Sequence, residues 1–297
     1  MCSSLTYFIF TRYESEHIKK ITTTIANRIL NCKPLFVRDN LVGMDSHFKK
    51  ISWGLSIKSN DVHMVGICGI GGIGKTTIAG SIYNQISWGF ECSNFLDVRE
   101  VYKNKGLLGL QNQLLNDTQE GANQKISNIR RGAHVIKNSL SLQKALIVFY
   151  DVDYMGQLEF LVGNQTWYGK GSRIIITTRD KRCLTMLNVD YLYEVEELNS
   201  NEALELFSQY AFRSNLPKDD FENLSHQAVQ YCEGLPLALR VLGSFLYGKT
   251  IREWESELHK LEKEPEVEIQ NVLKISFDGL DLTQKTVLLD IACFFSR

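Results

Sequence analysis

The stretch that decides the fold is GIGGIGKTT, residues 69–77. It fits the pattern G-x-x-x-x-G-K-[ST] and has an additional glycine pair inside the loop. Glycines lack a Cβ atom, so their backbone can curve until successive N–H groups point at the oxygens of a phosphate. Lys75 would supply a mobile positive charge for the β- and γ-phosphates, and the Thr76 hydroxyl could ligate Mg²⁺. The stretch therefore predicts a phosphate-binding loop.

The residues on either side of this loop support that prediction. An apolar run at 64–68 predicts a strand that leads into the loop, and Ile78, Ile82 and Ile86 recur at helical spacing after it. The first turn of that helix would add the positive end of its dipole to the site. The alternative, a chance glycine turn, is disfavoured by this position between a predicted strand and a predicted helix.

Residues 61–190 alternate short apolar runs with helical segments, which is typical of a parallel sheet flanked by helices. The nearly continuous apolar run at 145–149 suits a strand that is buried on both faces. The expected strands are His63–Cys68, Asn94–Val98, Lys144–Phe149, Arg173–Thr177 and Tyr191–Glu194.

After Leu198 the sequence predicts helices only. Capping boxes are expected at 199–202 and at 250–253, each at the start of a helix. Gly234 is predicted to be the C′ residue of one helix, and Pro236 is predicted to start the next, where its missing N–H costs nothing.

Two further runs complete the candidate site. FYDVD, residues 149–153, ends a predicted strand, and Asp151 is the best candidate for the acid that holds a metal ion in a P-loop ATPase. GSRIIITTRD, residues 171–180, ends in Arg179, whose planar fork of donors could bind a γ-phosphate. Asp151 and Arg179 are therefore the predicted catalytic residues. The alternative is a core strand followed by solvated polar residues.

Composition excludes several other classes of protein. The chain has 297 residues, enough for about two packed units, and its 33 Lys+Arg nearly balance its 34 Asp+Glu. With a net charge of −1 and no basic stripe, direct nucleic-acid binding is disfavoured. No run is long and apolar enough to predict a membrane span, and the opening residues do not fit a secretory signal. The seven cysteines show no C-x-x-C spacing, so reduced thiols in a cytoplasmic or nucleo-cytoplasmic protein are expected.

Together these motifs resemble the NB-ARC nucleotide-binding region of plant disease-resistance proteins of the TIR class (TIR-NBS-LRR). The resemblance covers about residues 12–297. Besides the runs quoted above, it rests on YEVEELNSNEALELFSQYAF (193–212), GLPLAL (234–239) and FDGL…LLDIACFF (277–295). Asp153, at a position where the coiled-coil class carries tryptophan, points to the TIR class.

The resemblance implies a domain organisation. An α/β P-loop NTPase domain, a parallel sheet flanked by helices, is expected at 34–195. An all-α helical subdomain is expected at 196–265, and the start of a winged-helix subdomain at 266–297. Residues 1–33 would form a tail and helical linker that follow a TIR domain. Most of the TIR domain and all of the leucine-rich repeats would be missing from this chain.

The family implies a molecular switch in plant defence signalling. ADP would be bound at rest, exchange for ATP would allow an open form that oligomerises, and slow Mg²⁺-dependent hydrolysis would reset the switch. The partners would be the nucleotide, the TIR and leucine-rich-repeat domains of the full-length protein, and further copies of it. Arg179 would sense the γ-phosphate. The residues implied to bind the nucleotide and Mg²⁺ are Val42, Gly43, Gly69, Gly71, Gly72, Gly74, Lys75, Thr76, Thr77 and Pro236.

The acidic motif departs from the family pattern. The family usually reads D-D-V-D, whereas this chain has Tyr150 in place of the first acid, followed by Asp151, Val152 and Asp153. Because strand side chains alternate, Asp151 is expected to point away from the position of the missing acid. The sequence thus predicts ADP binding with weakened use of Mg²⁺ and little hydrolysis. The segment 91–100 is one residue shorter than the family pattern, so no role is assigned to Arg99.

Two other interpretations stay open. An ordinary P-loop enzyme, such as a small-molecule kinase, would need a substrate lid and an intact catalytic acid, and neither is visible in the sequence. A degenerate scaffold or gene fragment would fold without cycling between nucleotides. Tyr150 and the two truncations favour this scaffold interpretation.

Overall fold

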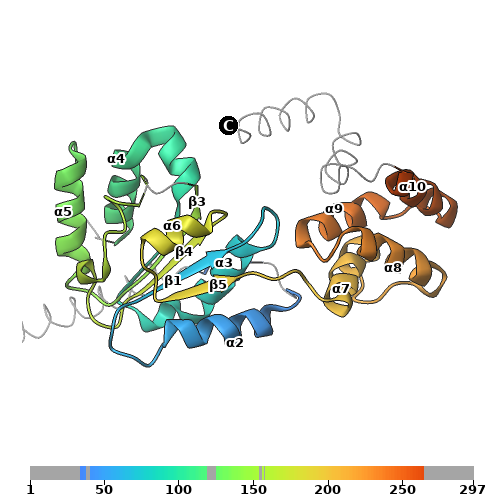
Figure 1. The fold of residues 1–297 in the computed structure, drawn as a ribbon, viewed down its shortest axis with the longest axis horizontal. Coiled ribbons are helices and arrows are strands. Elements are labelled where there is room, and N and C mark those ends of the chain that lie inside the picture. Colours follow the sequence, from blue (N-terminus) through green and yellow to red (C-terminus); the bar gives the residue numbers. More distant parts are fainter. Residues whose placement is uncertain (1–33, 38–40, 119–124, 154–155, 157, 264–297) are drawn as a thin grey trace, which may run out of the picture. The chain divides into compact units, whose positions relative to one another are not determined.

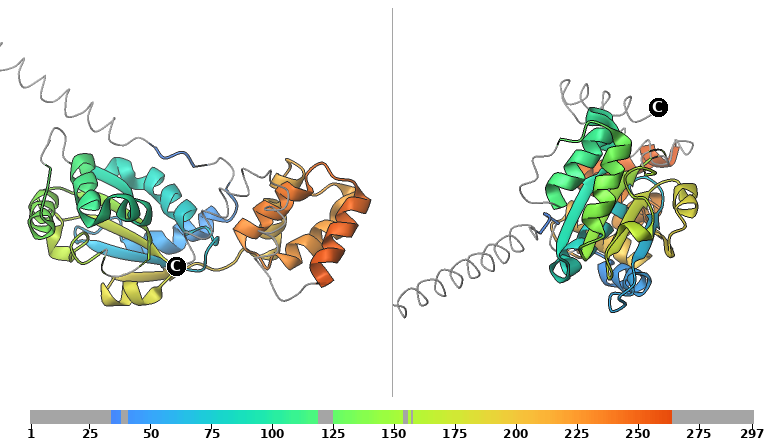
Figure 2. Two further views of the ribbon diagram at one scale, coloured as in Figure 1. Left: turned by 90° about the horizontal axis from the view of Figure 1, so that it is seen from above. Right: turned by 90° about the vertical axis from the view of Figure 1, so that its left-hand side faces the viewer.

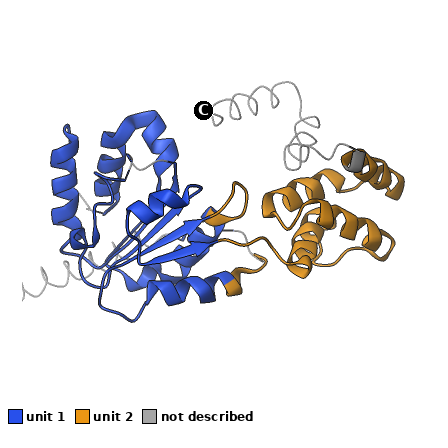
Figure 3. Cartoon of the chain, in the orientation of Figure 1, with its two compact units in different colours: residues 1–38, 47–68, 76–194 blue, residues 39–46, 69–75, 195–297 orange. Residues whose placement is uncertain are grey.

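The computed structural model describes residues 34–37, 41–118, 125–153, 156 and 158–263. The chain divides into two compact units, which are coloured in Figure 3. Of the described residues, those within 34–37, 47–68 and 76–194 form the first unit, and those within 41–46, 69–75 and 195–263 form the second. The predicted tail at 1–33 and the predicted winged-helix segment at 266–297 lie outside the described residues.

The first unit is built on a five-stranded sheet with the strand order β2-β3-β4-β1-β5 (Figure 1). Every neighbouring pair of strands is parallel, which confirms the predicted α/β class. The strands are β1 (His63–Cys68), β2 (Cys92–Asp97), β3 (Ala145–Val152), β4 (Arg173–Thr178) and β5 (Tyr191–Glu194). The helices along this part of the chain are α2 (Met44–Leu55), α3 (Lys75–Ile86), α4 (Val98–Thr118), α5 (Ile129–Leu140) and α6 (Lys181–Met186).

Alternate strand residues reach the two faces of this sheet. Met64, Ile147 and Ile174 share one face, and they form a cluster with buried residues of α4, α5 and α6. The helices α4 and α5 also pack against each other (Figures 1 and 2). On the opposite face the ring of Phe95 meets Tyr83 of α3. The sheet is therefore covered on both sides, as its apolar strands require.

The bounds of β2, β3 and β4 differ from the sequence prediction by one to three residues, and the C-terminal ends of β2 and β3 matter most for the site. β2 ends at Asp97, because the Asp97 carboxylate accepts the Glu100 N–H at 2.9 Å and so caps α4, which begins at Val98. β3 continues three residues past Phe149, through the acidic motif to Val152. The hydrophobic pattern alone does not predict where β2 and β3 end, because both ends depend on polar side chains.

In the described part of the second unit that follows β5 in the sequence, all the regular elements are helices. The helices are α7 (Ser200–Ala211), α8 (Glu222–Tyr231), α9 (Pro236–Leu246) and α10 (Ile251–Lys263). Their core contains an aromatic cluster in which Trp254 contacts Phe207, Phe212 and Phe221. The indole N–H of Trp254 donates to the Leu246 carbonyl at 2.9 Å, so this buried polar group is satisfied.

The predicted helix boundaries in this unit are largely correct. The capping box at Asn199 is complete, and Pro236 is at the start of α9. At Thr250 the Glu253 carboxylate accepts from both the N–H and the hydroxyl of Thr250. The prediction that Gly234 is the C′ residue was wrong by one position: α8 ends at Tyr231 with Cys232 as its C-cap, so Glu233, with a positive φ of 47°, is the C′ residue.

Among the described residues, no helix is long and apolar enough to cross a membrane.

Candidate functional site

The glycine loop connects the last residue of β1 to the first residue of α3. Gly72 and Gly74 have φ angles of +79° and +100°, a region that residues with a Cβ rarely adopt. At Gly72 a Cβ would also lie 2.7 Å from the Cβ of Leu237, so the loop could not pack as it does with any other residue there. The predicted backbone curvature is therefore present, and it depends on glycine.

Lys75 is buried at 8% exposure although it carries a charge. Its Nζ donates to the Gly69 carbonyl at 2.8 Å and to the Ile70 carbonyl at 2.7 Å. Both acceptors belong to the glycine loop, so the ammonium group is held against the loop backbone. An anion bound by the loop N–H groups would meet this charge. Thr76 and Thr77 follow in the first turn of α3, and both are exposed.

The second unit brings three of the predicted nucleotide segments together (Figure 3). The Leu237 N–H donates to the Gly72 carbonyl at 3.2 Å, which ties the glycine loop to the start of α9 next to Pro236. Val42 is buried, and Gly43 packs against Glu202 near the start of α7. The segments at 42–43, 69–75 and 236 thus share one unit. Thr76, Thr77, Asp151 and Arg179 belong to the other unit.

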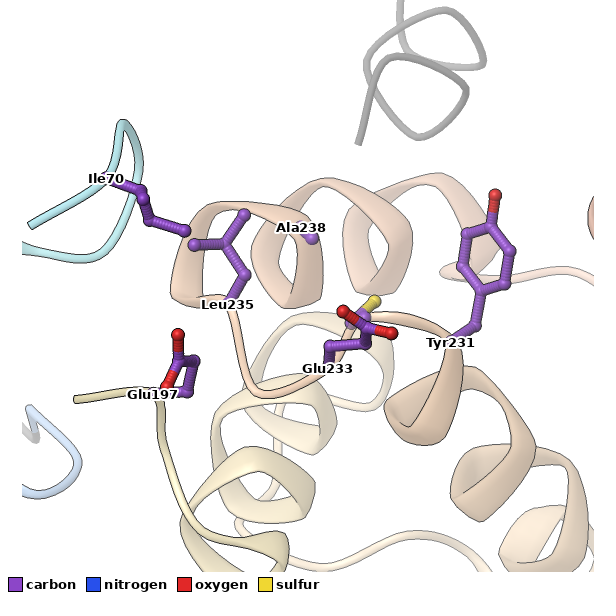
Figure 4. A pocket seen from close by; sticks show the side chains of 7 residues that line it. Ile70, Glu197, Tyr231, Glu233, Leu235 and Ala238 are labelled. Atoms are coloured by element: carbon purple, nitrogen blue, oxygen red, sulfur yellow. The ribbon is translucent and has the colours of Figure 1, made fainter. Parts of the chain in front are cut away.

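A small pocket in the second unit includes part of the glycine loop (Figure 4). It is lined by Ile70, Glu197, Tyr231, Cys232, Glu233, Leu235 and Ala238. Its volume of about 60 Å³ has room for water but not for a nucleotide. Burial raises the pKa of the Cys232 thiol to about 12, so this thiol is neutral and unreactive at physiological pH.

The end of β3 departs from a regular strand at the acidic motif. Phe149 pairs with Ile176, but Val152 pairs with Thr178, so three steps on β3 match two on β4. Asp151, inside this bulge, has a φ of +54°, and its N–H donates to the Thr177 hydroxyl at 3.0 Å. Regular alternation of side chains between the two faces of the sheet therefore does not hold at Asp151, because the strand is irregular there.

The contacts nevertheless separate Tyr150 from Asp151. The Tyr150 ring packs against Phe95, on the face covered by α3, with the ring centroids 4.7 Å apart. Asp151 instead pairs with Arg99 in the first turn of α4, and Arg99 Nε lies 3.2 Å from Asp151 Oδ2. Tyr150 and Asp151 thus contact different residues: Tyr150 packs against Phe95, and Asp151 pairs with Arg99.

Tyr150 remains a neutral phenol. Burial raises its pKa well above the ordinary value, and the nearby carboxylate of Asp97, which is also its hydrogen-bond partner, raises it further. Glu100 and Asp151 contribute in the same direction. A neutral phenol is a poor replacement for the carboxylate oxygen that Mg²⁺ prefers.

The residues at this end of β3 do not fit a divalent cation held by the acidic motif. Tyr150 is uncharged, and Asp151 already has a cationic partner within the chain. No group of three or more His, Cys, Asp or Glu side chains that could hold a metal ion occurs in the part of the chain that the structure describes.

Arg179 directly follows β4 and its side chain is exposed. The next residue, Asp180, caps α6 through its side chain, so the turn after Arg179 has a defined geometry. Arg99 was not assigned a role from the sequence. The signal that could have identified it is its position directly after a predicted parallel strand, at the same edge of the sheet as Asp151.

Comparisons with known proteins agree with the geometry. Residues 44–217 match the NB-ARC domain. The chain is 55% identical over 285 residues to "Disease resistance protein RUN1" of Vitis rotundifolia, covering 95% of this chain and 21% of that protein. It is 40% identical over 291 residues to "TMV resistance protein N" of Nicotiana glutinosa, covering 95% of this chain and 25% of that protein. The chain thus spans about a fifth to a quarter of the length of these relatives.

Among solved structures, Cdc6p from Pyrobaculum aerophilum is similar in fold, with a TM-score of 0.54 and 10% identity. The similarity covers 77% of this chain and 66% of that one. At this identity it supports the P-loop NTPase fold alone. The family match covers more than half of the chain, from α2 to beyond α7. The chain therefore belongs to the NB-ARC domain family, which occurs in plant disease-resistance proteins.

Proposed function

We propose that this chain is the ADP/ATP-binding switch of a plant intracellular immune receptor. ADP is bound at rest, and exchange for ATP permits an open, oligomerising form that signals in defence. Residues 196–265 act as the helical subdomain and 266–297 as the start of a winged-helix subdomain. The TIR and leucine-rich-repeat domains of a full-length, cytoplasmic protein are its intramolecular partners.

The observation that carries this proposal is the arrangement of the glycine loop. Lys75 is held against the loop backbone, and the Leu237 N–H donates to the Gly72 carbonyl, so the loop and the start of α9 are linked by a main-chain hydrogen bond. A change at the loop, such as gain or loss of a phosphate, would act directly on α9. This is the type of connection that a nucleotide-dependent switch requires.

The proposal is tested by the nucleotide that co-purifies with the protein. The purified chain is denatured, and the released nucleotide is identified and quantified against the protein. We expect a stoichiometric amount of ADP from the wild type and none from Lys75→Ala, because the loop then lacks its positive charge. Lys137→Ala, which changes an exposed lysine of α5, is the matched control and should retain ADP.

A second candidate function is a scaffold that folds but no longer cycles. Tyr150 favours it, since the acid that family members use with Mg²⁺ is replaced by a neutral phenol. The same experiment separates the two candidates. A folded wild-type protein that releases no nucleotide would contradict the switch and support the scaffold. Bound ADP with at most very slow ATP hydrolysis would support a switch that is reset by exchange and not by turnover.

A further inference from the structure

Arg99 supplies positive charge at the acidic end of β3. Its side chain is only 15% exposed, and its Nε lies 3.2 Å from Asp151 Oδ2 and 3.7 Å from Asp153 Oδ2. Two carboxylates converging on one place repel each other unless a cation lies between them. Here that cation is a guanidinium group from the chain itself.

The backbone of β3 is shaped to present Asp151 to Arg99. The bulge between Phe149 and Val152 adds one residue to β3 relative to β4. Asp151 lies inside the bulge and has a left-handed φ of +54°. The N–H of Asp151 donates to the Thr177 hydroxyl. Bulges of this kind re-aim a side chain, and aspartate is among the few residue types that tolerate such a φ.

The third carboxylate of this region is also engaged by the chain. Asp97 accepts the Glu100 N–H at 2.9 Å, which fixes the first turn of α4 and therefore the position of Arg99. Tyr150 adds a side-chain hydrogen bond to the same carboxylate. Asp97, Asp151 and Asp153 thus each have a donor or a cation from within the protein.

We propose that the Arg99 guanidinium replaces the divalent cation at the end of β3, so that this chain binds its nucleotide with an affinity that does not depend on Mg²⁺. The inference rests on the proposed nucleotide binding and makes it more specific. For Mg²⁺ to bind through Asp151, it would have to displace a guanidinium that is mostly buried. An unpaired charge would then remain in a partly buried place, which is costly. Mg²⁺ also gives up its own water ligands reluctantly.

The experiment compares the affinity of the 297-residue chain for ADP, and for a non-hydrolysable ATP analogue, in excess Mg²⁺ and in EDTA. For the wild type the two conditions should agree within about twofold. Arg99→Gln frees Asp151 and Asp153, so Mg²⁺ should then improve the affinity by about fivefold or more, in the usual range of coupling between two ligands. Arg99→Lys keeps the charge and should behave like the wild type, which separates loss of charge from loss of folding.

A second readout needs no nucleotide. Binding of Mn²⁺ to the nucleotide-free protein, followed by electron paramagnetic resonance, should be absent in the wild type and in Arg99→Lys and present in Arg99→Gln. Failure to bind any nucleotide would contradict the proposed function, and the Mn²⁺ titration would still decide the role of Arg99.

Two results would overturn the inference. One is a wild-type protein whose nucleotide affinity rises about tenfold or more with Mg²⁺, a coupling too strong for a site already filled by a guanidinium. The other is an Arg99→Gln protein whose nucleotide affinity stays independent of Mg²⁺, together with a Tyr150→Asp protein whose nucleotide affinity rises with Mg²⁺. The missing acid alone would then explain the behaviour, and Arg99 would have only a structural role.

Discussion

The ends of β1 and β3 lie at the same edge of one parallel sheet, yet they depart from the expected pattern to very different degrees. After β1, the left-handed conformations fall on glycines, and the loop keeps the full sequence pattern. After Phe149 of β3, the left-handed conformation falls on Asp151, and Tyr150 occupies the position where the resemblance led us to expect an acid.

The two places differ in the groups that they offer to a ligand, which are backbone N–H groups after β1 and charged side chains at the end of β3. A glycine loop of this type offers backbone N–H groups, whose direction depends on glycine conformations, and here also on packing against Leu237 of α9. The end of β3 offers side-chain charge, and a single substitution can remove or redirect a side chain. The glycine loop is therefore less sensitive than the end of β3 to the substitution of a single side chain.

The largest effect is expected at the loop after β1. Gly72→Ala would place a Cβ 2.7 Å from Leu237 in a backbone region that is strained for alanine. Strain of about 1–3 kcal/mol in the nucleotide-competent loop corresponds to an affinity loss on the order of tenfold to a hundredfold. Titration with a fluorescent ADP analogue measures it.

The matched control for this prediction is Gly248→Ala, at a glycine with a similar φ of +76° and no atom within 4 Å of the added Cβ. It should leave nucleotide affinity unchanged. Equal affinity losses in the two variants would mean that Gly72 matters for general stability and not for the loop.

A smaller effect is expected from the backbone of Asp151. Asp151→Ala and Asp151→Gly both remove the ion pair with Arg99, but only alanine has the steric cost of the left-handed conformation. The alanine variant should therefore be less stable than the glycine variant by about 1 kcal/mol. Urea unfolding of both proteins measures this difference. Equal stabilities would show that the backbone relaxes at Asp151 once the ion pair is lost.

The smallest effect concerns the ion pair itself. A double-mutant cycle with Arg99→Gln and Asp151→Asn should give a coupling energy of about 0.5 kcal/mol, because Asp151 is 30% exposed and solvent screens the pair. Unfolding free energies of the four proteins provide the cycle, measured at low and at high salt. A coupling that is zero at both salt concentrations would contradict a direct interaction between the two side chains.

Much of the fold followed from local sequence pattern. The parallel sheet, the glycine loop between a strand and a helix, and the capping box at Asn199 were predictable because each depends on neighbouring residues. The boundary between β2 and α4 was misplaced, since it is set by the Asp97 cap and not by hydrophobicity. The predicted site residues 42–43 and 236 were assigned by resemblance, and their roles in nucleotide binding remain predictions.

The sequence by itself determined the fold class and the position and curvature of the glycine loop, because glycine spacing and apolar periodicity are local properties that act on the backbone directly. Only the tertiary structure decided the role of the acidic motif. Arg99 and Asp151 are 52 positions apart, and their pairing depends on the neighbouring places of β2 and β3 in the sheet and on the bulge at Asp151. Interactions between distant side chains arise from the packing of the sheet, which no single stretch of sequence encodes.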